Sequence, residues 1–275
     1  MYEIAIERLE SAAQLFPGNK LSIALASIAS GNTGGRLWSL DETDLTQLTL
    51  FWDQGNNVFY LGGHNTSATA EQALCRLVRD VVRQQAIEIG AIYFSSRAMS
   101  SDMQPLLQSA FADHLHLQRP MLFYLYEQPA ICTSWPLAPD IQLLPIDQSL
   151  LTATDYRNLV PIRAEISWMW PSIERFLEHG WGVAAVHRNE TAVCWVTAEY
   201  VSARQCAVGI ETSPEFRQQG IATAAAARFV AESLQRGVQV GWECEADNPP
   251  SVRLAEKLGF TLVERYDFLS GNFRS

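Results

Sequence analysis

The sequence predicts an α/β protein with mixed sheets, built as two domains in tandem. In the second half of the chain, short apolar stretches typical of strands alternate with longer segments of helical periodicity. The first half repeats a β-α-β-α-β order with elements of similar length. Between the halves, residues 127–145 contain four prolines and little periodic pattern, which is typical of a connector. We therefore place the domains at residues 1–135 and 136–275.

The first half shows five elements, each marked by composition and bounded by turn residues. In order they are a strand, a long helix, a strand, a helix and a strand: residues 57–61, 68–88, 91–95, 101–111 and 120–126.

The second half predicts a strand, one or two helices ending at Gly180, a hairpin, and then a β-α-β-α-β run. The expected ranges are residues 141–146, 158–180, 181–187, 191–200, 206–212, 220–236, 238–244, 251–258 and 262–269. Gly237 is the expected stop of the helix that begins at residue 220.

The most informative stretch joins the strand at 206–212 to the helix at 220. After a Ser213-Pro214 turn it reads Arg217-Gln218-Gln219-Gly220-Ile221-Ala222, followed by a helix of small residues. A loop that ends in glycine at a helix start offers several free backbone N–H groups and the positive end of the helix dipole. The stretch therefore predicts a pyrophosphate-binding site.

This loop resembles the acyl-CoA loop of the GNAT superfamily of N-acetyltransferases, whose signature is R/Q-x-x-G-x-G/A. A second stretch, Asn248 followed by Leu258-Gly259-Phe260, resembles the next motif of the same superfamily. The element order of residues 141–270 is also that of the GNAT fold. The resemblance implies a GNAT domain in the second half. The first half, whose turn at 62–67 lacks the signature, is expected to be a degenerate GNAT-like domain with a structural role.

The resemblance implies that acetyl-CoA binds in a notch where two parallel strands splay apart. The pantetheine amides would pair with the strand, and the diphosphate would sit on the loop amides, with an arginine adding charge. The matching cofactor positions are Ile210, Thr212, Arg217, Gln218, Gln219, Gly220, Ile221, Ala222, Asn248 and Ser251. A side chain at Gly220 would keep the backbone from the phosphates. For Asn248 and Ser251, an ordinary role at a helix N-terminus remains the alternative.

Transfer to an amine also requires a proton acceptor, and Glu211 is the best candidate. It is a charged residue in an apolar strand, although a carboxylate paired with an arginine or facing solvent is the alternative. Glu243 and Glu245 are the next candidates for the proton acceptor. The family's usual tyrosine, which protonates the leaving thiolate, is replaced by Ala255. Tyr200 is the candidate substitute, or the thiolate leaves unaided because its pKa is near 8.5.

These features predict a GNAT N-acetyltransferase that transfers an acetyl or other acyl group from acetyl-CoA to a primary amine by direct attack. Trp168, Met169, Trp170 and Trp181 could shape the amine pocket or belong to the core. Two alternatives remain: a non-catalytic acyl-CoA-binding module, and an interaction protein whose first half recruits a partner. The identity of the amine stays open, as does the oligomeric state, with a homodimer among the options.

The charge and the composition of the chain limit the classes of partner that we expect. A formal net charge of −10 without any cluster of Lys and Arg argues against nucleic acid and anionic membranes. Five scattered cysteines without a C-x-x-C pair, and no signal peptide or membrane span, predict a cytoplasmic protein. His114 and His116 have no further ligands nearby in the sequence, so no metal site is expected. Residues 31–35 lack the Lys-Ser/Thr of a P-loop and are expected to form a flexible turn.

Overall fold

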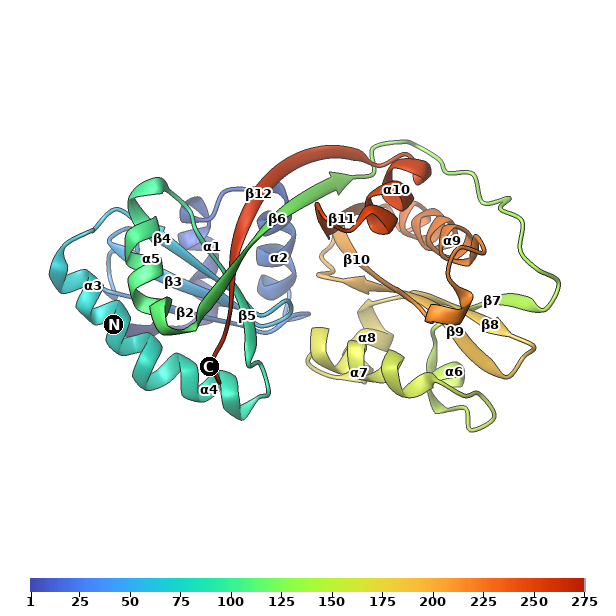
Figure 1. Ribbon diagram of the computed structural model, residues 1–275, viewed down its shortest axis with the longest axis horizontal. Coiled ribbons are helices and arrows are strands. Elements are labelled where there is room, and N and C mark those ends of the chain that lie inside the picture. The colour runs from blue at the N-terminus through green and yellow to red at the C-terminus, as the bar shows by residue number, and fades with distance from the viewer. Residues whose placement is uncertain (275) are drawn as a thin grey trace. The chain divides into compact units, whose positions relative to one another are not determined.

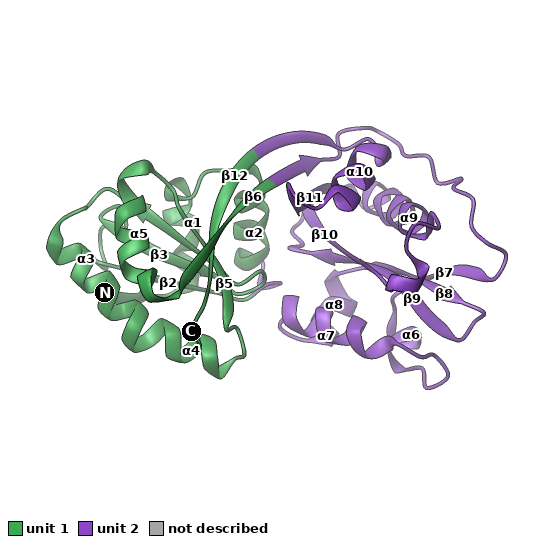
Figure 2. Ribbon diagram, viewed as in Figure 1, with its two compact units in different colours: residues 1–29, 34–121, 265–275 green, residues 30–33, 122–264 purple. Residues whose placement is uncertain are grey.

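The computed structural model describes residues 1–274, which divide into two compact units (Figure 2). Unit 1 comprises residues 1–29, 34–121 and the chain from Arg265 onward, and unit 2 comprises residues 30–33 and 122–264. Apart from the short segment 30–33, the chain passes from unit 1 to unit 2 between Met121 and Leu122, whereas the sequence placed a boundary at 135. The chain also returns to unit 1 at its end, which the linear division did not include.

The structure contains every element expected for the first half, although the last of these strands passes from unit 1 into unit 2, and the sheet of unit 1 begins earlier in the chain than the sequence indicated. Its elements are β1 (Tyr2–Ile4), α1 (Leu9–Ala12), α2 (Asn19–Ala29), β2 (Gly35–Ser39), β3 (Leu48–Asp53), β4 (Val58–Gly63), α3 (Ala68–Leu77), α4 (Arg83–Glu88), β5 (Tyr93–Ala98), α5 (Gln104–Phe111) and the first part of β6 (Leu115–Leu125) (Figure 1). A π-helical segment, Val78–Val82, joins α3 to α4, so the long helix expected at 68–88 is continuous.

The sheet of unit 1 has the order β1-β2-β3-β4-β5-β12, where β12 (Thr261–Asn272) is the last strand of the chain. Its pairs are antiparallel except β4 with β5, which run parallel from Val58 opposite Ser95 to Leu61 opposite Ala98. The end of β12 pairs with β5, placing Leu269 opposite Ser96.

The core of unit 1 includes a phenylalanine cluster to which the C-terminal segment contributes. Phe273 is completely buried and stacks on Phe94, with ring centroids 4.3 Å apart. Its ring also approaches Phe59 and Phe111, and its N–H donates to the carbonyl of Ile92. The last residues of the described chain therefore form part of the core of unit 1.

Unit 2 confirms the order of elements expected for the second half and adds one short helix, α6. Its elements are β7 (Ile141–Pro145), α6 (Gln148–Thr152), α7 (Leu159–Met169), α8 (Ile173–His179), β8 (Gly182–His187), β9 (Thr191–Glu199), β10 (Gln205–Thr212), α9 (Ile221–Gln235), β11 (Gln239–Glu245), α10 (Pro249–Leu258) and the first part of β12. The sheet has the order β7-β8-β9-β10-β11-β6, the end of β6 lying beside β11.

Helices cover both faces of the sheet of unit 2, with α9 and α10 on one face and α7 and α8 on the other (Figure 1). Ala224, Ala225, Ala226 and Ala227 of α9 are buried, and their small side chains allow the helix to approach the strands closely. Trp181 stacks on Phe229 and donates to the hydroxyl of Ser233. Of the four residues proposed for an amine pocket, Trp170, Trp181 and Met169 are therefore core residues, and Trp168 is exposed.

The turn at residues 30–33 packs into unit 2 instead of forming a loose turn. The side chain of Asn32 donates to the carbonyl of Val201 at 2.8 Å and accepts from Nε of Arg175 at 2.9 Å. Arg175 also donates to the carbonyl of Ser30. Glycines alone suggested mobility, but a buried amide with both of its polar atoms bonded holds the segment in place.

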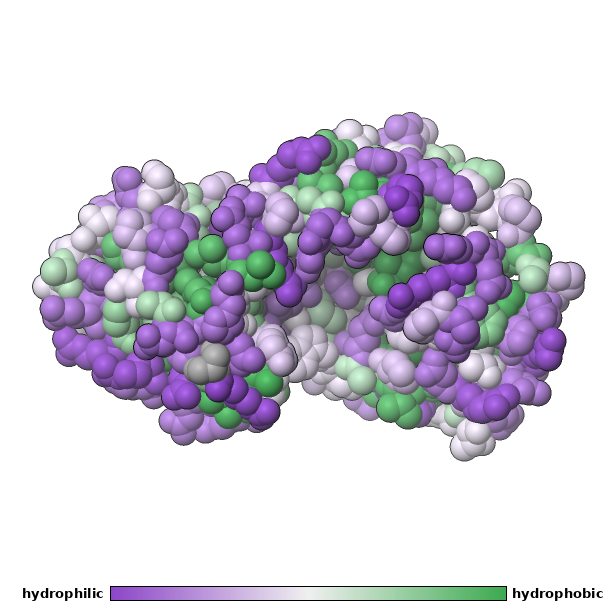
Figure 3. Space-filling view, viewed as in Figure 1, coloured by the Kyte–Doolittle hydropathy of each residue, from purple (hydrophilic) through white to green (hydrophobic). Residues whose placement is uncertain are grey.

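The surface fits the composition of the chain. On the face seen in Figure 3, most of the surface of each unit is hydrophilic, and the hydrophobic residues form smaller areas within it. Within residues 1–274, no helix combines the length and the apolar character that crossing a lipid bilayer requires.

The burial of Phe273 predicts that the C-terminal segment stabilises unit 1. Phe273→Ala should lower the free energy of unfolding by about 3–5 kcal/mol, as for other buried phenylalanines. Arg274→Ala, at the exposed neighbour, is the matched control and should change it little. Denaturant unfolding followed by circular dichroism measures both, and equal stability of the two variants would show that the segment does not hold the core.

Candidate active site

The candidate site is built where two parallel strands of unit 2 separate. Strand β10 pairs with β9 from Ala207 opposite Glu199 to Thr212 opposite Cys194. Its parallel pairing with β11 runs only from Gln205 opposite Gln239 to Ala207 opposite Gly241. Beyond Ala207 the edge of β10 is therefore no longer paired with β11. At its end, the N–H of Thr212 donates to the Glu211 carboxylate and the carbonyl of Thr212 accepts from Arg217, so side chains take the place of the neighbouring strand there.

The loop after β10 leads into α9 through two residues with left-handed backbone angles. Gln218 has a φ of +62° and Gly220 a φ of +80°, a conformation that glycine adopts without strain. Gly220 is the N-cap residue of α9, and no side chain caps this end. The first N–H groups of the helix have no intrahelical partner and, with the helix dipole, suit an anion.

A cavity of about 590 Å³ opens between the edge of β10, the start of α9 and the outer face of α10. It is lined by Ile210, Glu211, Thr212, Phe216, Arg217, Gln218, Gly220, Ile221, Ala222, Thr223, Trp242, Asn248, Pro250, Ser251, Arg253, Leu254 and Lys257. Every cofactor position expected from the sequence is among these residues except Gln219. The side chain of Gln219 instead donates to the carbonyl of Glu215 at 3.0 Å.

Asn248 and Ser251 line the cavity and also stabilise the start of α10. Asn248 is the N-cap residue, and its side-chain oxygen accepts from the N–H of Ser251 at 3.4 Å. The hydroxyl of Ser251 accepts from Nε1 of Trp242 at 3.0 Å. Both residues therefore stabilise the start of α10 and line the cavity at the same time. The amide of Asn248 and the hydroxyl of Ser251 are held at the cavity wall.

The cavity carries more positive than negative side chains, although the whole chain has a net charge of −10. Arg217, Arg253 and Lys257 line it, against the single carboxylate of Glu211. Local positive charge beside an uncapped helix N-terminus suits a ligand with several phosphates.

Glu211 is held in the paired arrangement that the sequence left as an alternative. Its carboxylate accepts from Arg217 at 3.1 Å and from the N–H of Thr212 at 3.2 Å. Arg217 also donates to the carbonyl of Thr212. The Glu211 side chain is 49% exposed and lines the cavity, so both a pairing role and contact with a ligand fit its position.

The expected proton donor and the two reserve carboxylates do not line the cavity. Tyr200 lies in the turn after β9, with a φ of +47° and only 1% of its side chain exposed. Ala255 is fully buried, and its neighbour Leu254 lines the cavity instead. Glu243 and Glu245 lie on β11, outside the set of described residues that line the cavity.

A carboxylate that the sequence reading missed lies beside the point where the strands separate. Glu199 on β9 and Gly209 on β10 share the sheet face that is covered by α7, and any Cβ at Gly209 would collide with the Glu199 carboxylate. Glu165 of α7 accepts on the same face from Trp195 and Thr197, at 2.7 and 2.5 Å. A glycine inside a strand is the signal that could have revealed this close approach.

The corresponding place in unit 1 is closed. Its parallel strands stay paired up to Leu61 opposite Ala98, and the N–H of Met99 adds one more bond to the carbonyl of Leu61. Helix α3 is capped by Ser67, whose hydroxyl accepts from the N–H of Ala70. The open strand edge and the uncapped helix that make the site of unit 2 are both replaced by satisfied hydrogen bonds.

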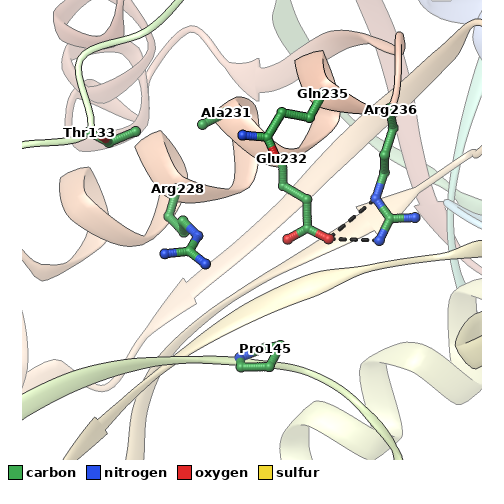
Figure 4. Close-up of a pocket in the computed structure, with 7 residues that line it drawn as sticks. All are labelled: Thr133, Pro145, Arg228, Ala231, Glu232, Gln235 and Arg236. Carbon is green, nitrogen blue, oxygen red and sulfur yellow. Dashed lines mark hydrogen bonds and ion pairs between the residues drawn. The ribbon is translucent and has the colours of Figure 1, made fainter.

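A second cavity of about 740 Å³ lies in unit 2 between the connector, α9 and β7 (Figure 4). It is lined by Thr133, Pro145, Arg228, Ala231, Glu232, Gln235 and Arg236. Arg236 pairs with Glu232 at 2.7 Å, so one of its two cations is neutralised (Figure 4). This second cavity adjoins the middle and the C-terminal end of α9, where the helix dipole repels anions. The cavity at the start of α9 is therefore the better anion site.

The cysteines of the sheet are unsuited to nucleophilic catalysis. Burial raises the pKa of the Cys194 thiol to about 12, and it raises the pKa of the Cys206 thiol as well. Both thiols are therefore protonated at neutral pH, and the thiolate is the reactive form. Within residues 1–274, no group of three or more His, Cys, Asp and Glu side chains is placed to hold a metal ion.

Comparisons with known proteins cover nearly the whole chain. A family model described as GNAT acetyltransferase matches residues 13–269. The chain is 23% identical over 266 residues to the uncharacterized N-acetyltransferase YdfB of Bacillus subtilis (strain 168), covering 97% of both proteins. The match includes most of the first half as well as residues 141–270, so the resemblance to the GNAT superfamily is confirmed without a division between the two halves.

Solved structures show the same fold. A GCN5-related N-acetyltransferase-like protein from Streptococcus suis 89/1591 is 19% identical with a TM-score of 0.66, covering 97% of this chain and 99% of that one. A tandem GNAT protein from the clavulanic acid biosynthesis pathway is 12% identical with a TM-score of 0.56, covering 98% and 93%. At this identity the likeness concerns the fold alone, and it confirms the predicted mixed α/β class.

The cap formed by Asn248 can be separated from any contact with a ligand. Asn248→Ala should lower the free energy of unfolding by about 1 kcal/mol because the N–H of Ser251 loses its acceptor. Asn248→Ser restores a capping oxygen and should recover most of this loss while still lacking the amide donor. Thermal unfolding of the three proteins tests this, and a wild-type melting temperature for Asn248→Ala would mean that the cap contributes nothing.

Proposed function

We propose that this chain, which belongs to the GNAT acetyltransferase family, transfers an acetyl group from acetyl-CoA to a primary amine. The observation that carries the proposal is the cavity at the end of the β10–β11 pairing. It combines an open strand edge, an uncapped helix N-terminus and clustered cations, which are the three features that the amides and phosphates of CoA require.

Each part of the cosubstrate has a matching surface in the cavity. The pantetheine amides would pair with the open edge of β10 at Ile210, and at Thr212 in exchange for its hydrogen bonds with Glu211 and Arg217. The diphosphate would accept hydrogen bonds from the N–H groups of residues 218–222, with Arg217 adding charge. The absence of a side chain at Gly220 leaves this approach open, since the nearest atom to a Cβ there would be the carbonyl oxygen of Pro136 at 3.9 Å.

The chemistry we propose is a single direct transfer. The lone pair of the neutral amine attacks the thioester carbonyl carbon, the carbon–sulfur bond breaks, and the sulfur leaves as a thiolate while the nitrogen loses a proton. The protein contributes orientation and backbone donors near the developing oxyanion. No cysteine is among the described residues that line the cavity, which supports this route over one through an acyl-cysteine.

The proton acceptor we propose is Glu211, because its carboxylate lines the cavity. Its ion pair with Arg217 holds it at the end of β10, and an arginine drawn toward the diphosphate would free it to accept a proton. Glu199 is the competing candidate, because Gly209 leaves room for its carboxylate beside the strand opening. Tyr200 was the proposed proton donor, and its buried position makes unaided departure of the thiolate the simpler route.

A second function, binding of acyl-CoA without turnover, is favoured by one observation. No tyrosine is among the described residues that line the cavity, and Ala255 takes the place of the family's usual general acid. Release of CoA thiol from acetyl-CoA in the presence of a panel of amines separates the two functions. Binding without release for every amine would favour the binding module.

The proposed diphosphate site predicts one CoA per chain, bound in unit 2. Gly220→Glu should abolish binding because it places a carboxylate at the phosphates. Gly237→Glu is the matched control, since Gly237 ends the same helix with a φ of +72° and open space around it. Isothermal titration calorimetry should show normal affinity for the control. Two CoA molecules per chain, or equal binding by both variants, would contradict the site.

The two candidate proton acceptors make opposite predictions. If Glu211 accepts the proton, Glu211→Gln should lower turnover by about 10²–10⁴-fold at pH 7, while Glu199→Gln has a much smaller effect. The loss should shrink at high pH, where the free amine predominates. Calorimetry measures acetyl-CoA affinity separately, because Glu211→Gln also alters the pairing of Arg217. A large, pH-dependent loss in Glu199→Gln alone would transfer the role to Glu199.

A further inference from the structure

The connector between β6 and β7 passes directly beside the candidate cofactor cavity. The carbonyl of Pro136 faces Gly220 at the diphosphate loop, and the ammonium of Lys257 lies 4.8 Å from the centre of the Trp135 ring. Trp135 is itself anchored, since its Nε1 donates to the carbonyl of Cys132 at 2.8 Å. In Figure 1 the segment runs from β6 past α10 and α9 to β7. An ordinary spacer would not require these contacts.

The end of the cavity next to this connector has the character of a nucleotide site. Arg253 and Lys257 lie one turn apart on α10 and both line the cavity. If the pantetheine arm follows the edge of β10 and the diphosphate sits at Gly220, the rest of CoA must extend toward α10. That remainder is an adenosine carrying a 3′-phosphate, which offers a flat purine ring and a further dianionic group.

We propose that the connector is part of the cofactor site, with Trp135 contacting the adenine and Lys257 binding the 3′-phosphate of CoA. The proposal rests on the proposed function for the identity of the ligand. An indole provides a large flat surface for a purine, and a lysine is a suitable point charge for a phosphate. The cation–π contact between Lys257 and Trp135 holds the two groups together before the ligand arrives.

Trp135→Ala tests the contact with the base. CoA affinity, measured by calorimetry on the full chain, should fall about tenfold, the order found for loss of one aromatic–base stack. S-acetylpantetheine, which lacks the nucleotide, should bind Trp135→Ala as it binds the wild type. Leu137→Ala, in the same connector, is the control for disturbance of the segment and should bind CoA normally. Equal CoA affinity in Trp135→Ala and the wild type, or equal losses in both variants, would overturn the proposal.

Lys257→Gln tests the phosphate contact. The wild type should prefer CoA over dephospho-CoA, and the variant should bind the two with nearly equal affinity. Undiminished discrimination in Lys257→Gln would refute the role of the lysine.

Trp135→Phe tests whether an aromatic surface is sufficient at this position. It should retain most of the CoA affinity, while the quenching of tryptophan fluorescence on CoA binding should decrease. Failure of the wild type to bind CoA at all would instead refute the proposed function.

Discussion

The site depends on one constraint, the early end of the parallel pairing between β10 and β11. A strand that leaves its neighbour exposes backbone groups that must find other partners. Strand β10 can do so because β9 remains paired to it up to Thr212 opposite Cys194. Unit 1 shows the other outcome, since β4 and β5 stay paired and Ser67 caps the following helix. The same succession of elements thus gives a continuous sheet in one unit and a binding cavity in the other.

The two helices that border the cavity begin in opposite ways, α9 without a capping side chain and α10 with one. Helix α9 begins at a glycine that supplies no capping group, which leaves its N–H groups and dipole for a ligand. Helix α10 begins with Asn248, whose side chain satisfies the N–H of Ser251 and fixes the opposite wall of the cavity. One wall therefore carries N–H donors without intrahelical partners, and the other begins at a capped helix. This combination suits recognition of an anion at a defined position.

The sequence predicted what depends on neighbours along the chain. The strand, the loop with Gly220 and the helix lie within one short stretch, so their residue types were sufficient to locate most of the cavity. The pairing of Arg217 with Glu211, the place of Glu199 over Gly209 and the contact of Trp135 with Lys257 depend on how separate segments meet. The burial of Tyr200 could not be predicted for the same reason, because burial is a property of the packed turn and not of the residue type.

The path of β12 has a consequence for how the chain is made. During synthesis, most of unit 1 is made before unit 2, but the edge of β5 and the pocket that receives Phe273 must wait until the chain has passed through unit 2 to β12. Until then the nascent chain carries an unpaired strand edge, which is a template for unwanted pairing with other chains. Completion of unit 1 therefore requires that all of unit 2 has been synthesised. A chain that stops within unit 2 leaves a defect in unit 1, most of which was synthesised before it.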